Sequence, residues 1–132
     1  MNRIILSLFA AWSLVFGFTS QAHHSFAAMY DAEGNVEIEG QIVQFLFRNP
    51  HSFLHVMVPD ENGELARWTV EWSGASALNT SGLRPDTLKR GDVVVITGNP
   101  GRNPDDRRVR MQTLHRPADG LNWGNRPGEV VD

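Results

Sequence analysis

The feature that most constrains the fold of this chain is the alternation of apolar and polar residues in short runs. Val36, Ile38 and Ile42 alternate with acidic and amide side chains, which is the period of a half-buried β-strand. Gly40 interrupts the run, so we expect a bend or bulge there. The other runs with strand character are residues 51–58, residues 65–72, the apolar stretch after "LKRGD", and residues 108–116.

Turn signals separate these runs. Asn49-Pro50 and Asn62-Gly63 are typical turn dipeptides, and residues 75–79 are the one stretch with helical character. Five strands with a single helix between the third and the fourth is the element order of an OB-fold. We therefore predict an all-β fold, a small five-stranded OB-like barrel with one short helix between strands three and four. A small open β-sandwich is the competing interpretation.

The first 22 residues have the character of a signal peptide. Arg3 precedes a 15-residue apolar core from Ile4 to Phe18, and Ser20 and Ala22 suit a signal peptidase site. The core is short for a membrane-spanning helix, so we expect cleavage, a periplasmic or secreted protein, and no membrane span afterwards. A retained membrane anchor is the alternative. The expected organisation is residues 1–22 as signal peptide, 23–34 as N-terminal arm, 35–118 as barrel and 119–132 as C-terminal tail.

Composition excludes several classes of function. The chain has no cysteine, so neither disulfides nor thiolate chemistry are available. Without Arg3 it keeps 11 basic and 15 acidic side chains, a net charge of −4. A mildly acidic exported protein is poorly suited to nucleic acid, and we expect no such partner. Nucleophile motifs and phosphate-binding loops are missing from the sequence as well.

Four of the five histidines lie in two clusters, "HHSF" and "NPHSFLHVMV". In the second cluster, strand alternation places Leu54 on a core face and His51, Phe53, His55 and Met57 on the opposite face. Two imidazoles and a thioether there would suit copper. If the face of the last strand lay against this one, two further side chains could contribute, Met111 and His115. The alternative is that these side chains are hydrogen-bonded or packing residues.

The expected cleavage site strengthens the metal hypothesis. Cleavage after Ala22 would give His23 a free α-amine, and the amine and imidazole of one residue can chelate a single ion. A second imidazole from His24, His51 or His55 would complete a nitrogen-rich set suited to Cu(II). We therefore expect a binding protein that holds a copper ion for metal handling. A solvated His-His dipeptide is the alternative for residues 23 and 24.

The stretch "RWTVEW" predicts a second kind of contribution. Alternation puts Trp68 and Trp72 on a core or groove face and Glu71 on the other. Glu71 could orient a ligating histidine, because the strands of a hairpin lie side by side. Pairing with Arg67 or Arg48 in solvent is the alternative.

Two rival functions remain open at this point. In the first, a barrel face with Phe53, Trp68 and Trp72 binds a small apolar ligand or a periplasmic protein partner. In the second, Glu71 and a histidine transfer protons in an accessory enzyme.

The segments "AHHSF", "VEIEGQIVQFLFRNPHSFLHVMV", "WTVEW" and "LKRGDVVVITGNP" together resemble a family of small exported bacterial proteins of unknown function. Its motifs are His-His-Ser at residues 23–25, Asn-Pro-His at residues 49–51, and Trp-x-x-Glu at Trp68 and Glu71. The resemblance implies export and a β-rich fold. It implies no activity.

Overall fold

A computed structural model describes residues 26–124 of the chain. Residues 26–29 form one helical turn. No helix in this described part is long and apolar enough to cross a membrane. The remaining elements, in chain order, are β1 (Val36–Leu46), β2 (Ser52–Pro59), β3 (Leu65–Trp72), α3 (Ala75–Thr80), β4 (Val93–Pro100), the 3₁₀ turn η1 (Pro104–Asp106), β5 (Arg108–Arg116) and β6 (Leu121–Trp123).

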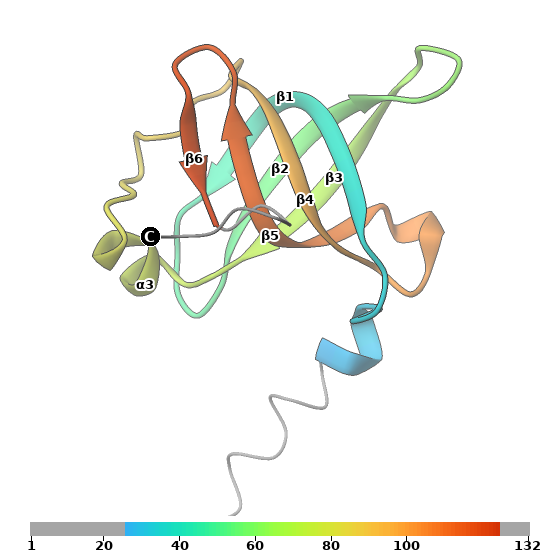
Figure 1. Cartoon of the computed structure of the whole chain (residues 1–132), viewed down its shortest axis with the longest axis horizontal. Helices are drawn as coiled ribbons and strands as arrows, with labels where there is room; N and C mark the ends of the chain where they lie inside the picture. The colour runs from blue at the N-terminus through green and yellow to red at the C-terminus, as the bar shows by residue number, and fades with distance from the viewer. Residues whose placement is uncertain (1–25, 125–132) are drawn as a thin grey trace, which may run out of the picture.

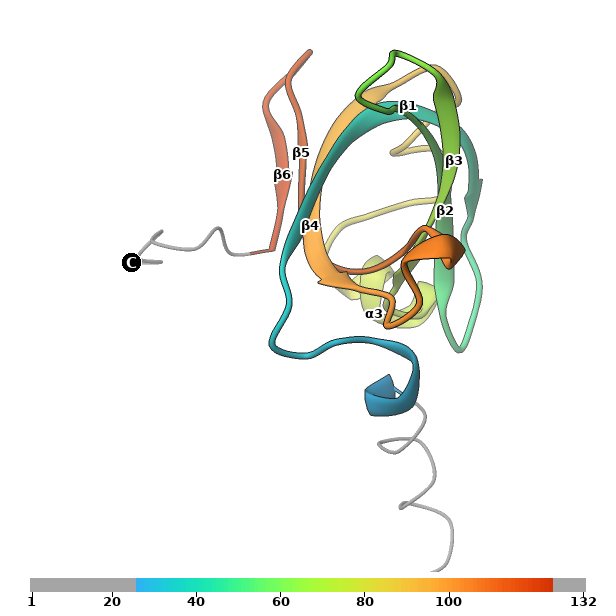
Figure 2. The ribbon, with the colours of Figure 1, turned by 90° about the vertical axis from the view of Figure 1, so that its right-hand side faces the viewer.

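The first five strands close into a barrel, which Figure 2 shows as a ring. β1 pairs antiparallel with β2 and β4, β2 pairs with β3, and β4 pairs with β5. The parallel pairing of β3 with β5 closes the barrel, with Thr69 to Glu71 beside Arg108 to Arg110. α3 lies at one end, between β3 and β4 in the chain. The predicted five-stranded barrel with one intervening helix is confirmed, and the open sandwich is wrong.

The predicted faces of the second strand are confirmed. Leu54 and Val56 are fully buried and Val58 packs against the core, whereas His55 and Met57 lie on the outer face with partial exposure. In α3 only Leu78 is buried, and it joins the core at the end of the barrel. Period-two alternation therefore identified the face of β2 that the fold buries.

The irregularity expected at Gly40 lies elsewhere. The register between β1 and β2 shifts between Ile42 and Gln44. At Gly40 the backbone of β2 approaches closely, and a Cβ there would collide with the carbonyl oxygen of Met57. The glycine thus permits close strand packing, while the bulge forms three residues further on.

The last strand does not lie against the second. β5 pairs with β4, β3 and β6, so the condition under which Met111 and His115 would join the ligands on β2 is not met. Met111 is 7% exposed and belongs to the core. Thr113 and Leu114 are both buried, which breaks the alternation before His115.

The C-terminal tail contributes a sixth strand that its sequence did not predict. β6 pairs antiparallel with the end of β5. The ring of Trp123 packs edge-to-face on Trp72, with centroids 4.8 Å apart. Three residues are too few to show an alternation in the sequence, so the strand is recognised only from its pairing with β5 and the packing of Trp123.

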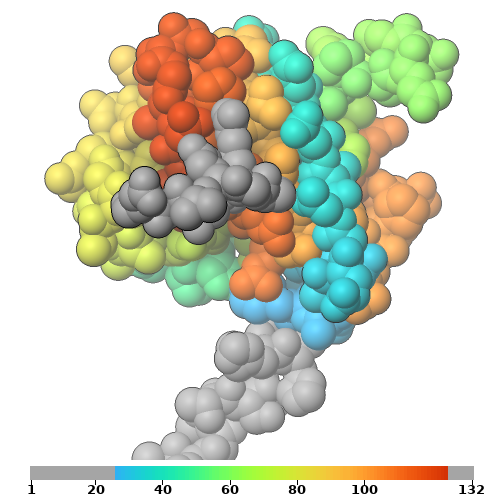
Figure 3. Space-filling model, viewed as in Figure 1, coloured from blue at the N-terminus to red at the C-terminus, as the bar shows by residue number. Residues whose placement is uncertain are grey.

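The N-terminal arm lies against the barrel where β4 turns into β5 (Figures 1 and 3). Tyr30 forms an isolated antiparallel bridge with Gly101, and the amide of Asp31 donates to the carbonyl of Pro100. Arg102 donates from its amide to the carbonyl of Met29 and from Nε to that of Ala27, at 3.0 and 2.6 Å. These bonds fix the arm over the β3–β5 junction.

Candidate functional site

A buried carboxylate lies under the arm. Glu71 belongs to the outer face of β3, between Phe53 of β2 and Arg110 of β5, yet it is only 7% exposed. Tyr30, itself 2% exposed, donates its hydroxyl proton to Oε2 of Glu71 at 2.6 Å. The other oxygen, Oε1, lies 2.6 Å from Nδ1 of His51. Both carboxylate oxygens therefore have a partner, as a buried charge requires.

Tyr30 acts as a hydrogen-bond donor over the whole ordinary pH range. Burial raises the pKa of its hydroxyl, and the hydrogen bond to Glu71 and its negative charge raise it further. The charges of Arg108 and Arg110 lower this pKa but do not outweigh the other effects. Tyr30 therefore keeps the proton that it donates to Oε2 of Glu71.

The turn that carries His51 is fixed from both sides. The buried hydroxyl of Ser52 accepts from the amide of Arg48 and donates to its carbonyl. Asn49 accepts from the amide of Ser76 in α3. Because these bonds hold the backbone, the His51 ring stays beside Glu71. In the neutral tautomer with its proton on Nδ1, the ring donates to Glu71, and Nε2 keeps a lone pair for a metal ion or a proton.

Phe26 connects the start of the described arm to His51. The two ring centroids are 5.2 Å apart. The guanidinium of Arg110 also lies over the ring of Phe26, at 4.3 Å from the ring centroid, and Arg108 donates to the sulfur of Met29 at 3.1 Å. Arginines of β5 and the preceding loop therefore hold the arm against the same surface that carries His51.

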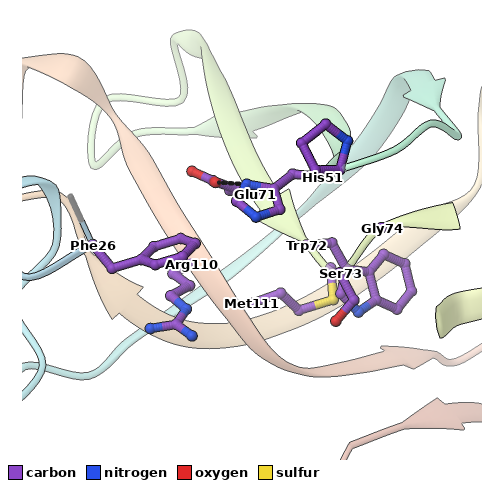
Figure 4. A pocket seen from close by; sticks show the side chains of 9 residues that line it. Phe26, His51, Glu71, Trp72, Ser73, Gly74, Arg110 and Met111 are labelled. Carbon is purple, nitrogen blue, oxygen red and sulfur yellow. Dashed lines mark ion pairs between the residues drawn. The ribbon is translucent and has the colours of Figure 1, made fainter. Parts of the chain in front are cut away.

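A pocket of about 320 Å³ opens beside this cluster (Figure 4). Phe26 and Arg110 lie on one side of it and Trp72 and Ser73 on the other, with Met111 between them. The dashed line in the figure marks the contact of His51 with Glu71. The nine residues that line the pocket are Phe26, Pro50, His51, Glu71, Trp72, Ser73, Gly74, Arg110 and Met111.

The second imidazole of β2 has a different environment. Nδ1 of His55 lies 3.3 Å from the hydroxyl of Thr69, its partner across the strands. Burial lowers the pKa of His55, and the positive charge of Arg67 lowers it further. Four residues of extended chain span about 13 Å, so His51 and His55 lie too far apart for one ion. Met57 lies further along β2 in the same direction.

The structure therefore divides the predicted ligand set. It brings His51 and Glu71 together and places His55 and Met57 elsewhere on β2. Within residues 26–124, no group of three His, Cys, Asp or Glu side chains comes close enough to hold a metal ion. His23 and His24 lie outside the described residues, so their predicted role stays a prediction.

Within residues 26–124, the three aromatic residues of the rival interpretation do not form one apolar groove. Phe53 lies on the outer face, where the guanidinium of Arg48 is 5.1 Å from its ring centroid. Trp72 is buried in the core, and Trp68, on the same inward face of β3, is partly buried and packs against that core. These positions separate Phe53 from both tryptophans.

The predicted contributor His115 lies elsewhere, because its Nδ1 contacts Oδ1 of Asn122 in β6 at 2.7 Å.

Sequence reasoning missed Tyr30, Phe26 and Arg110. Tyr30 is the chain's one tyrosine. It lies in a segment without strand or helix periodicity, and this position was the only sequence signal that could have drawn attention to it. The alternative interpretation of Glu71, a solvent pairing with Arg67 or Arg48, is wrong, because Glu71 is buried against Tyr30 and His51. The carboxylate–histidine pair that both the metal and the enzyme interpretations need is present.

The closed barrel of five strands, with a helix between β3 and β4, defines a small OB-like β-barrel domain. Residues 13–110 match the model of the "Family of unknown function (DUF6152)", and the chain belongs to this family. Comparison with curated proteins finds no match. Among solved structures, the chain is similar to the mitochondrial single-stranded DNA binding protein Rim1 of S. cerevisiae. That similarity has a TM-score of 0.48 and 12% identity, and covers 64% of this chain and 93% of the other.

Proposed function

We propose that the exported protein, beginning at His23, binds a copper ion with Nε2 of His51 as one ligand and His23 as another. The observation that carries this proposal is the contact of Glu71 with Nδ1 of His51. A carboxylate that accepts the second ring proton of a histidine is the common support of a metal-binding imidazole, because it fixes the tautomer and makes the ligand more basic.

The position of the arm supports the choice of the second ligand. His23 precedes Phe26 by three residues, so its Cα lies within about 11 Å of that of Phe26 in any conformation. Phe26 packs on the His51 ring. The α-amine and imidazole of His23 would therefore be tethered beside His51, and two imidazoles with an amine suit Cu(II). Export, cleavage after Ala22 and a role in periplasmic copper handling are parts of the same proposal.

The test is a Cu(II) titration of protein that begins at His23. His51→Ala should weaken binding by roughly 100-fold or more, because it removes a ligand. The matched control is His55→Ala on the same strand, which should change the affinity by less than about threefold. Equal losses in both variants would contradict the proposal, and so would tight binding that survives His51→Ala.

Two further measurements use the same protein. One additional residue before His23 removes the amine chelate and should weaken Cu(II) binding strongly without altering the fold. Affinity should also fall as pH drops through about 6, because imidazoles must be deprotonated to ligate. A Cu(I) site that used Met57 would survive the additional residue, so titration with both oxidation states separates the two.

A further inference from the structure

Two side chains that line the pocket beside His51, Ser73 and Arg110, have hydrogen-bond donors that no other described residue uses. Its one carboxylate, Glu71, already accepts from Tyr30 and contacts His51 with its other oxygen. The hydroxyl of Ser73 has no side-chain partner among the described residues, and Ser73 is exposed at the pocket wall. A ligand that complements this pocket must therefore bring acceptors.

Arg110 is the one side chain of permanent positive charge that lines this pocket. Within residues 26–124 it forms no ion pair with an acidic side chain. Its guanidinium lies over the ring of Phe26, which restrains the flat group. Its N–H edge remains available in the plane of the guanidinium. A restrained arginine with a free edge suits a carboxylate, which can accept two parallel hydrogen bonds.

Part of the wall is apolar. Phe26, Met111 and Trp72 form this part, and Met111 lies between Arg110 and Ser73 (Figure 4). A volume of about 320 Å³ is at the lower end of the range for small-molecule sites. A ligand with one charged end and a compact apolar body matches both the lining and the size.

We propose that this pocket binds a small organic carboxylate, with its anionic group on Arg110 and its apolar body against Phe26 and Met111. The Ser73 hydroxyl donates to a second acceptor on the ligand. Two other ionisable groups face the site. Glu71 keeps both oxygens on its partners, and His51 is neutral or positive, so neither replaces the carboxylate as the counterion of Arg110. Arg110, Phe26, Met111 and Ser73 are not ligands of the proposed copper site, so this proposal does not depend on copper binding.

The test compares benzoate with benzamide, its neutral analogue of nearly the same shape, on ¹⁵N-labelled protein from His23 to Asp132 in the presence of a chelator. Benzoate should bind at least about tenfold more tightly, because a hydrogen bond to a charged group is stronger than one between neutral groups. The amide signals of Ser73 and Arg110 should shift with benzoate and saturate. Sodium chloride at equal ionic strength controls for screening.

Arg110→Gln should weaken benzoate binding by about tenfold or more and leave benzamide unchanged. The matched control is Arg90→Gln, which removes an exposed arginine that does not line the pocket and should have no effect. Equal binding of benzoate and benzamide to the unaltered protein would overturn the proposal without reference to any variant. An affinity for benzoate that Arg110→Gln leaves unchanged would overturn it too, as would shifts that never saturate.

Discussion

His51 and His55 start from the same sequence signal and end in different environments. Both belong to the polar face that alternation assigns to one run of residues. His51 lies 2.6 Å from a buried carboxylate, under an aromatic ring. His55 lies 3.3 Å from a threonine hydroxyl, with its pKa lowered by burial and by Arg67. A shared face therefore does not mean a shared site.

The cause of the difference lies in the elements next to each histidine. His55 lies in the middle of the sheet surface, between Thr69 of β3 and Gln44 of β1. At the other end of the hairpin, β3 meets β5, and the arm crosses over this junction through the bridge of Tyr30 with Gly101. The arm buries Glu71, which makes its contact with His51 stronger than it would be in water. The interacting polar side chains therefore lie together where β3, β5 and the N-terminal arm meet.

The largest effect that we expect from this comparison is on stability. Tyr30→Phe removes the hydroxyl that donates to Oε2 of Glu71 and should lower the free energy of unfolding by roughly 1.5–3 kcal/mol, the usual contribution of a hydrogen bond to a charged group. Thr69→Val removes the corresponding hydroxyl at His55 and should cost about 1 kcal/mol or less. Urea unfolding of both variants measures the two losses, and equal losses would remove the distinction between the regions.

The next effect concerns copper. Glu71→Gln keeps the size of the side chain and removes its charge, so Nδ1 of His51 can contact only a neutral acceptor, which makes the imidazole a less basic ligand. Cu(II) affinity should fall roughly 10- to 100-fold, as for other partners of metal-binding histidines. Glu39→Gln is the matched control, because it makes the same change at an exposed position of β1. If both variants bound Cu(II) equally well, Glu71 would have no part in ligation.

Most of the barrel could be predicted from the sequence because local patterns determine it. The alternation of Leu54 and Val56 with His55 identified the buried face of β2, and the five strand runs with one helix identified the topology. The proximity of Glu71 to a histidine could also be anticipated, since β2 and β3 form a hairpin. In each case the information lies within a run of residues or between neighbouring strands.

The rest of the site could not be predicted, because it depends on contacts between distant segments. Tyr30 and Glu71 are 41 residues apart in the chain, and nothing in the arm's sequence marks its docking position. The parallel pairing of β5 with β3 places Arg110 beside Glu71, and its contact with Phe26 joins β5 to the distant N-terminal arm. Alternation alone does not reveal which strand a face opposes, so the sequence leaves open whether Met111 lies near the ligands of β2 or in the core.

The smallest expected effect is the pH dependence of stability at His55. Burial and the charge of Arg67 lower the pKa of this imidazole in the folded protein below its ordinary value of 6.5. The unfolded chain therefore binds a proton more readily than the folded protein does. Above the ordinary pKa the ring is neutral in both states and contributes nothing. As pH falls through that value, protonation favours the unfolded chain and the free energy of unfolding decreases.

His55→Gln should remove the part of this decrease that comes from residue 55, and Arg67→Gln should reduce it. Urea unfolding at about pH 7.5 and about pH 5.5 compares the three proteins. A His55→Gln variant that lost as much stability as the unaltered protein between these values would show that the ring is no less basic in the folded state, and the contrast with His51 would then rest on hydrogen bonding alone.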